Sequence, residues 1–170
     1  LGNCGLSSAG ASPPLVRVDS LLIRAITAYP TAEFTLDCKL LTEGDWWKYL
    51  HAFSDAVIEL DDHPALHGRM LVECQSLDFL RLLSLKRKGF PTFYYATEFD
   101  GSIDLARSAE CAGITMMHDR LDPEQAERIR SAGLSLTLFG TSSKWSHRHA
   151  FSLRPDRLQT DLPAYAKGLR

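Results

Sequence analysis

The sequence lacks the signatures of several common functional classes. It contains no G-x-G-x-x-G loop, no Walker phosphate loop and no G-x-S-x-G elbow, which argues against nucleotide-binding folds built on those motifs and against the α/β-hydrolases. Its cysteines, Cys4, Cys38, Cys74 and Cys111, follow no zinc-binding spacing. No apolar run approaches the roughly 20 residues that cross a bilayer, and a net charge of −2 gives no strong attraction to nucleic acid or anionic membranes.

The composition is that of an ordinary globular domain. The chain has 170 residues, of which 45% are hydrophobic and 24% are charged. A chain of this length buries a core without disulfides, so we expect reduced cysteines in a cytoplasmic protein. Residues 1–12 show no strand or helix period and are expected to form a loop-like tail before a domain over residues 13–170. The chain opens with Leu1 rather than Met, as if cut from something longer.

Strand and helix patterns alternate along the chain. Helical periods or caps occupy residues 15–28, 43–60 (after Thr42 as the expected N-cap), 78–88, 102–112, 123–132, 145–151 and a last segment from Pro163. Strand patterns occupy residues 32–38, 69–74, 92–97, 114–117, 134–139 and 157–160. Six such units predict an α/β fold with parallel strands. A TIM (β/α)8 barrel needs eight units, so about six are present here; a doubly wound sheet is the alternative.

Three places in the sequence are more specific than this pattern. The first runs from Phe34 to Lys39 (FTLDCK), and the second from Leu71 to Asp78 (LVECQSLD). The third comprises GLSLTLFGTS over residues 133–142 and PDRLQTDLP over residues 155–163. In this order and spacing they resemble the glycerophosphodiester phosphodiesterase family, a TIM-barrel family of the phospholipase-C-like phosphodiesterases.

The resemblance implies roles for several residues. The family has Glu-x-Lys on the strand that here reads Asp37-Cys-Lys39, which implies that Asp37 binds a divalent metal, Mg²⁺ or Ca²⁺, and that Lys39 contacts the substrate phosphate. Phe139 replaces a family tryptophan that forms an apolar wall near the substrate. Gln75 and Tyr95 also end strands and are candidates for the substrate pocket, although Tyr95 also suits core packing.

The departures from the family are equally informative. Its acid–base histidines lie in a His-Arg-Gly and a later His-Asp on the first two strands, and its other metal acids lie in a Glu-x-Asp; the first two strands are absent from this sequence. His118 is the best remaining titratable group for catalysis and is expected to face the barrel mouth, with a plain loop histidine as the alternative. The chain then corresponds to the C-terminal part of the barrel, completed by a second fragment, by a longer chain or by a homo-oligomer.

Two functions follow as expectations. The first is metal-dependent hydrolysis of a small glycerophosphodiester to glycerol 3-phosphate and an alcohol, and the second is a non-catalytic binding or interaction module that has lost the histidines. A different hydrolase or a sugar-phosphate barrel is a third reading. Outside the site, we expect Asp161 to cap the last helix, and the cluster from His147 to His149 to form a solvated helix face.

Overall fold

The computed structural model describes residues 17–40 and 44–168. The expected tail, Cys4 and the expected cap Thr42 lie outside the described residues. Within the described ranges, six strands form one parallel sheet, and their order in the sheet is their order in the chain. The strands are β1 (Phe34–Asp37), β2 (Met70–Cys74), β3 (Thr92–Tyr95), β4 (Gly113–Met117), β5 (Ser135–Thr141) and β6 (Arg157–Thr160).

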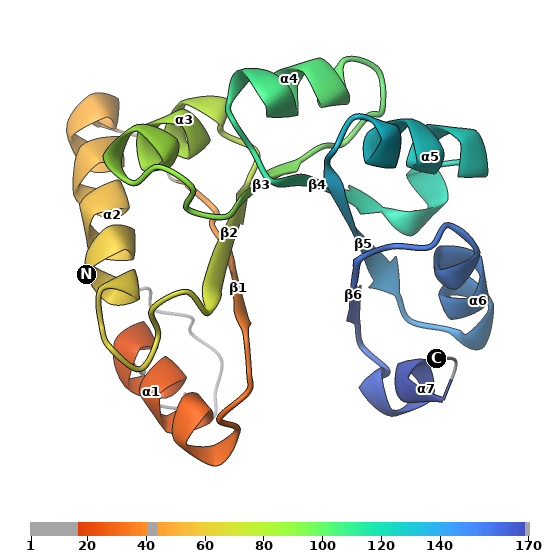
Figure 1. Ribbon diagram of the computed structural model, residues 1–170, viewed down its shortest axis with the longest axis horizontal. Helices are drawn as coiled ribbons and strands as arrows, with labels where there is room; N and C mark the ends of the chain where they lie inside the picture. Colours follow the sequence, from red (N-terminus) through yellow and green to blue (C-terminus); the bar gives the residue numbers. More distant parts are fainter. Residues whose placement is uncertain (1–16, 41–43, 169–170) are drawn as a thin grey trace, which may run out of the picture.

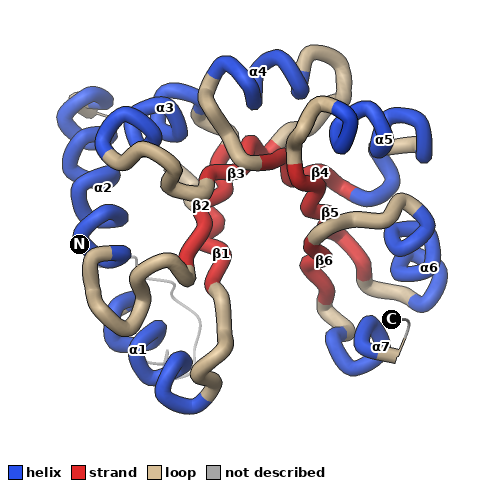
Figure 2. Tube along the Cα trace, viewed as in Figure 1, coloured by secondary structure: helices blue, strands red, loops and turns tan. Residues whose placement is uncertain are grey.

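Helices connect the strands and cover one side of the sheet. They are α1 (Val18–Ala28), α2 (Trp46–Asp61), α3 (Leu77–Lys86), α4 (Ser102–Ser108), α5 (Pro123–Ser131), α6 (Lys144–Ser152) and α7 (Pro163–Lys167), with a 3₁₀ turn η1 (His118–Arg120) after β4. The sheet curls, with these helices outside the curve and β1 and β6 facing each other across an open side (Figure 1; Figure 2). This is most of a TIM barrel, as predicted; a doubly wound sheet has helices on both faces and a reversed strand order.

Side-chain caps set where several of the helices begin. Asp122 accepts a hydrogen bond from the backbone N–H of Gln125 and the Gln125 side chain returns one, which confirms the cap predicted before Pro123. The helix predicted from residue 43 begins at Trp46, because the side chain of Asp45 accepts from the Lys48 N–H. Side-chain caps of this kind begin α2, α3, α5 and α6, whereas α1, α4 and α7 begin without one.

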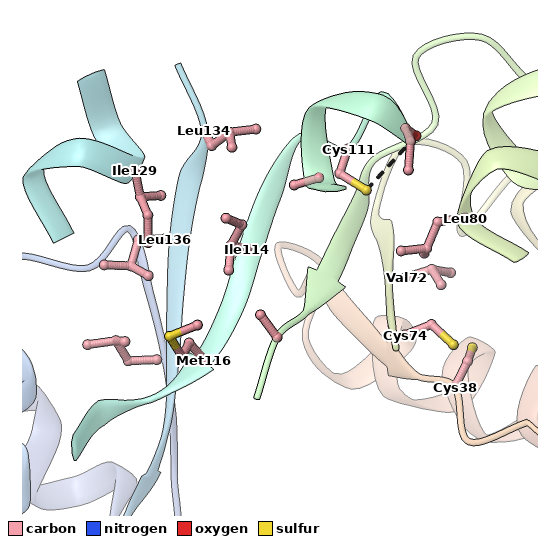
Figure 3. Packing of buried hydrophobic residues seen from close by; sticks show 14 of the residues in the cluster. Cys38, Val72, Cys74, Leu80, Cys111, Ile114, Met116, Ile129, Leu134 and Leu136 are labelled. Atoms are coloured by element: carbon pink, nitrogen blue, oxygen red, sulfur yellow. Dashed lines mark hydrogen bonds between the residues drawn. The ribbon is translucent and has the colours of Figure 1, made fainter. Parts of the chain in front are cut away.

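The core lies between the sheet and its helices. Alternate strand residues point outward, so Val72, Ile114 and Leu136 pack with Leu80 and Ile129 of the covering helices (Figure 3). Three cysteines belong to this layer, and all three are buried free thiols: Cys38, Cys74 and Cys111. Among the helices of the described residues, none is long and apolar enough to cross a membrane.

Candidate functional site

The concave face of the sheet is mostly polar. Register places Asp37 opposite Glu73, Tyr95 opposite Thr115, and Met117 opposite Phe139, so these side chains share the face that the helices do not cover. The polar side chains of this face are Thr35, Asp37, Glu73, Thr115, Ser135, Thr137, Arg157 and Gln159. TIM-barrel interiors are usually filled by branched apolar residues, so the polar face of this sheet departs from that tendency.

Four of the residues selected from the sequence form a continuous group at the carboxyl ends of the strands. Lys39 Nζ lies 2.5 Å from Asp37 Oδ1 and 4.8 Å from the centroid of the Tyr95 ring. The Tyr95 ring stacks on Phe139, with centroids 5.1 Å apart. The group therefore runs from β1 through β3 to β5 and joins a charge pair to an aromatic wall, at the end of the barrel where TIM-barrel active sites lie.

The charge pair is open to solvent. The side chain of Lys39 is 69% exposed and that of Asp37 is 48% exposed. The hydrogen bond to Asp37 raises the pKa of Lys39, so the ammonium is charged at neutral pH. Exposed pairs contribute little to stability, about 0–1 kcal/mol, so this pair is available to an anion without a large structural cost.

An open cavity of about 400 Å³ adjoins the aromatic wall. Its lining residues come from the ends of β5 and β6: Phe139, Gly140, Thr141, Gln159, Thr160 and Asp161. The expectation that Asp161 caps the last helix is wrong: Leu162 is the N-cap residue of α7, and it has no side-chain cap bond. The backbone N–H of Leu162 instead donates to Thr160 Oγ1, which leaves Asp161 at the cavity.

Among the described residues, two predicted site residues form no hydrogen bond, salt bridge or ring contact with the group. Gln75 follows β2, is exposed, and its side chain makes no hydrogen bond to the described residues. His118 is 5% exposed, and its ring packs against α6, with centroids 5.6 Å from His149 and 6.3 Å from Trp145. His118 begins the 3₁₀ turn that follows β4, and its ring also lies beside Gly140 of the cavity, so its role at the barrel mouth stays a prediction.

Burial controls the chemistry of His118. Desolvation lowers the pKa of its imidazole, and the nearby Asp119 opposes that shift. Within the described residues no group bonds to His118 Nδ1, while its backbone oxygen contacts His149 Nε2 at 3.1 Å. The lowered pKa favours the neutral form of this ring at pH 7.

Two buried polar residues were not selected from the sequence. Glu73 is 2% exposed and accepts hydrogen bonds from Thr115 and Gln159, at 2.9 and 2.8 Å. His147 is fully buried, with Nδ1 2.6 Å from the Ser143 carbonyl and Nε2 2.5 Å from Thr160 Oγ1, so the expected solvated face is wrong at this residue. Glu73 could have been noticed in the sequence, because it is the one charged residue in the otherwise apolar strand from Met70 to Cys74.

The described residues do not make a metal site by themselves. Nowhere in residues 17–40 and 44–168 do three His, Cys, Asp or Glu side chains gather as metal ligands. Mg²⁺ and Ca²⁺ prefer several oxygen ligands, and Asp37, the carboxylate expected to bind one, is paired with Lys39. A cation at Asp37 therefore needs ligands from outside the described residues.

Comparison with known proteins identifies the fold. No family model matches the sequence, and no curated protein matches it. Solved structures do match, including a protein from Silicibacter pomeroyi assigned as a glycerophosphoryl diester phosphodiesterase, with a TM-score of 0.80 and 15% identity over 90% of this chain. A glycerophosphodiester phosphodiesterase from Parabacteroides distasonis gives a TM-score of 0.73 and 11% identity over 89% of this chain.

A third structure carries a ligand. An Oleispira antarctica phosphodiesterase in complex with the product sn-glycerol-3-phosphate gives a TM-score of 0.71 and 15% identity over 86% of this chain. This chain has the fold of these phosphodiesterases. It spans only part of them, namely 55% of the Silicibacter protein, 62% of the Parabacteroides protein and 57% of the Oleispira protein. The predicted partial barrel is therefore confirmed.

Proposed function

We propose that this chain is the larger part of a glycerophosphodiester phosphodiesterase, which hydrolyses a small phosphodiester to glycerol 3-phosphate and an alcohol. The single observation that carries the proposal is the group Asp37–Lys39–Tyr95–Phe139 at the carboxyl ends of the strands. The fold shared with phosphodiesterases, one of which holds glycerol 3-phosphate, supports it. Fold alone does not imply function, so the site residues must carry the argument.

Each residue of the group has a distinct task. The Lys39 ammonium binds a phosphate oxygen and stabilises the charge that develops there during hydrolysis. The Tyr95 ring lies under this ammonium and limits the positions that the flexible lysine adopts. Phe139 backs Tyr95 and presents an apolar wall to the carbon part of the substrate beside the cavity at β5 and β6.

The remaining chemistry comes from outside the described residues in this proposal. Asp37 supplies one oxygen ligand to Mg²⁺ or Ca²⁺, and the strands that complete the barrel supply the other carboxylates and the acid–base groups. The completing strands belong to a longer chain, a second fragment or a second copy. The buried thiols favour a reducing compartment such as the cytoplasm.

A binding or interaction module is the second candidate. It is favoured by the placement of His118, because the one histidine selected for proton transfer is buried against α6. Under this hypothesis the Lys39 group binds a phosphorylated ligand without cleaving it. The two candidates differ in product release, which is directly measurable.

The test uses the longest natural polypeptide that contains this chain, assayed for release of glycerol 3-phosphate from glycerophosphocholine with and without a chelator. Lys39→Met should lower kcat/KM by about 10²–10³-fold, as loss of a charge-stabilising group does. The matched control is Lys88→Met, because Lys88 is exposed and pairs with none of the described residues. Release that is unaffected by Lys39→Met would contradict the proposal, and phosphate-dependent binding without release would favour the binding module.

A further inference from the structure

Cys38 and Cys74 are two buried thiols at the carboxyl ends of neighbouring strands. The register of β1 and β2 places Asp37 beside Glu73, so the next two residues in register are the cysteines. The backbone N–H of Cys38 donates to the Glu73 carbonyl at 2.9 Å, which continues the strand pairing up to this point. Both side chains belong to the core between the sheet and its helices, and Figure 3 shows their sulfur atoms turned toward one another. The fold therefore brings together two thiols from different parts of the chain.

The spacing of parallel strands suits a disulfide between these positions. Neighbouring strands lie about 4.8 Å apart, and disulfides join Cα atoms that are about 4.4–6.8 Å apart. Cys111, the third described thiol, comes before β4 and so lies at the amino ends of the strands. At about 3.3 Å per residue, strands of this length separate Cys111 from the other two thiols by about 10 Å or more. Of the described thiols, only Cys38 and Cys74 can join while the sheet stays folded.

The surroundings of the two sulfurs differ. The backbone N–H of Ser76 donates to Cys74 Sγ at 3.4 Å, and Ser76 is the N-cap residue of α3. Within the described residues, no hydrogen-bond donor reaches Cys38 Sγ. A donor of this kind favours negative charge on the sulfur, so Cys74 is the better nucleophile of the pair.

We propose that Cys38 and Cys74 form a reversible disulfide when the protein meets a peroxide. The Cys74 sulfur attacks one oxygen of hydrogen peroxide, the O–O bond breaks, and a sulfenic acid and one water result. The Cys38 sulfur then attacks the Cys74 sulfur, so that the S–S bond forms and the S–O bond breaks. The departing hydroxide takes the Cys38 proton and becomes a second water. Two thiols are oxidised, and one peroxide is reduced to two waters.

The disulfide acts on the neighbouring charge pair. Cys38 lies between Asp37 and Lys39 in the chain, and its side chain points to the opposite face of the sheet. The Cβ atoms of a disulfide are about 3.8 Å apart, which is about 1 Å less than the spacing of the strands. Oxidation therefore draws the end of β1 toward β2, and Lys39 moves relative to the Tyr95 ring, whose centroid lies 4.8 Å from its ammonium in the reduced protein. Reduction restores the group.

Peptide mapping of the folded chain tests the link. The protein carries Cys4→Ser, because Cys4 lies outside the described residues, and it is treated with excess hydrogen peroxide, since buried thiols react slowly. Remaining thiols are alkylated in urea, and the digest is analysed by mass spectrometry. The main cross-link should join Cys38 to Cys74 and disappear with dithiothreitol, while Cys111 remains a thiol. The same oxidation carried out in urea is the control, and it should give links among all three cysteines.

Two further variants check the order of the steps. In Cys38→Ser, oxidation of Cys74 should stop at the sulfenic acid, which dimedone traps, whereas in Cys74→Ser the Cys38 thiol should remain. If circular dichroism shows that either variant does not fold, the cross-links of the Cys4→Ser chain still decide. A folded chain that gives no link between Cys38 and Cys74, or that gives a link to Cys111 instead, would overturn the inference.

Nuclear magnetic resonance tests the effect on the site without substrate. The backbone amide signals of Lys39 and Tyr95 should shift on oxidation and return on reduction, whereas the signal of the exposed Lys88 should stay in place. Unmoved signals of Lys39 and Tyr95 in the cross-linked protein would overturn the effect on the charge pair. Because neither readout involves turnover, absence of hydrolysis would count against the proposed function and not against the disulfide.

Discussion

The side chain of Gln159 donates a 2.8 Å hydrogen bond to Glu73, although the two residues are 86 positions apart in the chain. Thr115 donates to the same carboxylate oxygen at 2.9 Å, so strands β2, β4 and β6 are joined across the concave face. Backbone hydrogen bonds join only neighbouring strands. These side chains therefore hold the curvature that brings the ends of the strands, and with them Lys39 and Phe139, around a common axis.

Removal of the Gln159 amide should destabilise the fold. Gln159→Leu takes away one of the two donors to the buried carboxylate of Glu73, and we expect the free energy of unfolding to fall by about 1–3 kcal/mol. Urea unfolding followed by circular dichroism measures this. The control is Gln75→Leu, because the exposed Gln75 side chain bonds to no described residue and its loss should change stability by about 0.5 kcal/mol or less. Equal effects at the two positions would contradict a structural role for the hydrogen bond to Glu73.

His147 should behave as a structural residue. Its ring joins the Ser143 carbonyl to the Thr160 hydroxyl, so His147→Leu removes two hydrogen bonds from a fully buried position and should cost about 1–3 kcal/mol of unfolding free energy, although both partners keep other hydrogen bonds. The neighbouring Arg148 is exposed, and Arg148→Ala should be nearly neutral. Thermal unfolding of the two variants compares them. A neutral His147→Leu would mean that this end of β6 is not held by α6.

The lowered pKa of His118 predicts loss of stability in weak acid. Burial keeps the folded-state pKa below the unfolded value of about 6.5, so the unfolded chain takes up a proton first as the pH falls. The contribution of the neutral His118 ring to the free energy of unfolding is fully present above about pH 6.5 and declines below it. Urea midpoints between pH 7.5 and pH 5 should fall more steeply for the natural chain than for His118→Phe. Parallel curves would show that His118 stays accessible to protons in the fold.

The buried thiol of Cys38 predicts a loss of stability at alkaline pH. Burial, with a smaller effect of Cys74, raises its pKa from 9.0 to about 12. The unfolded chain loses the proton first, so stability is complete below about pH 9 and falls between pH 9 and pH 12, by at most about 1.4 kcal/mol per pH unit. Cys38→Ala should flatten this slope. Rapid alkylation of Cys38 at pH 8 without denaturant would contradict the predicted burial.

Local patterns in the sequence predicted the elements well. The strand expected over residues 157–160 is β6 as observed, and the cap at Asp122 forms as expected. These features depend on neighbours in the chain, namely alternation, turn residues and side chains that reach the next few N–H groups. The resemblance to the phosphodiesterases selected Asp37, Lys39 and Phe139, and the structure places them with Tyr95 at one edge of the parallel sheet.

The sequence by itself determined the six βα units and their parallel pairing, because both depend on spacing along the chain, and it indicated the residues at the strand ends through the resemblance to the phosphodiesterases. Only the tertiary structure decided which way His118 turns, that His147 is enclosed, and that Glu73 meets Thr115 and Gln159. Those outcomes depend on the curl of the sheet and the fit of α6 over it. Such contacts join residues far apart in the chain, so the local spacing of apolar and polar residues does not predict them.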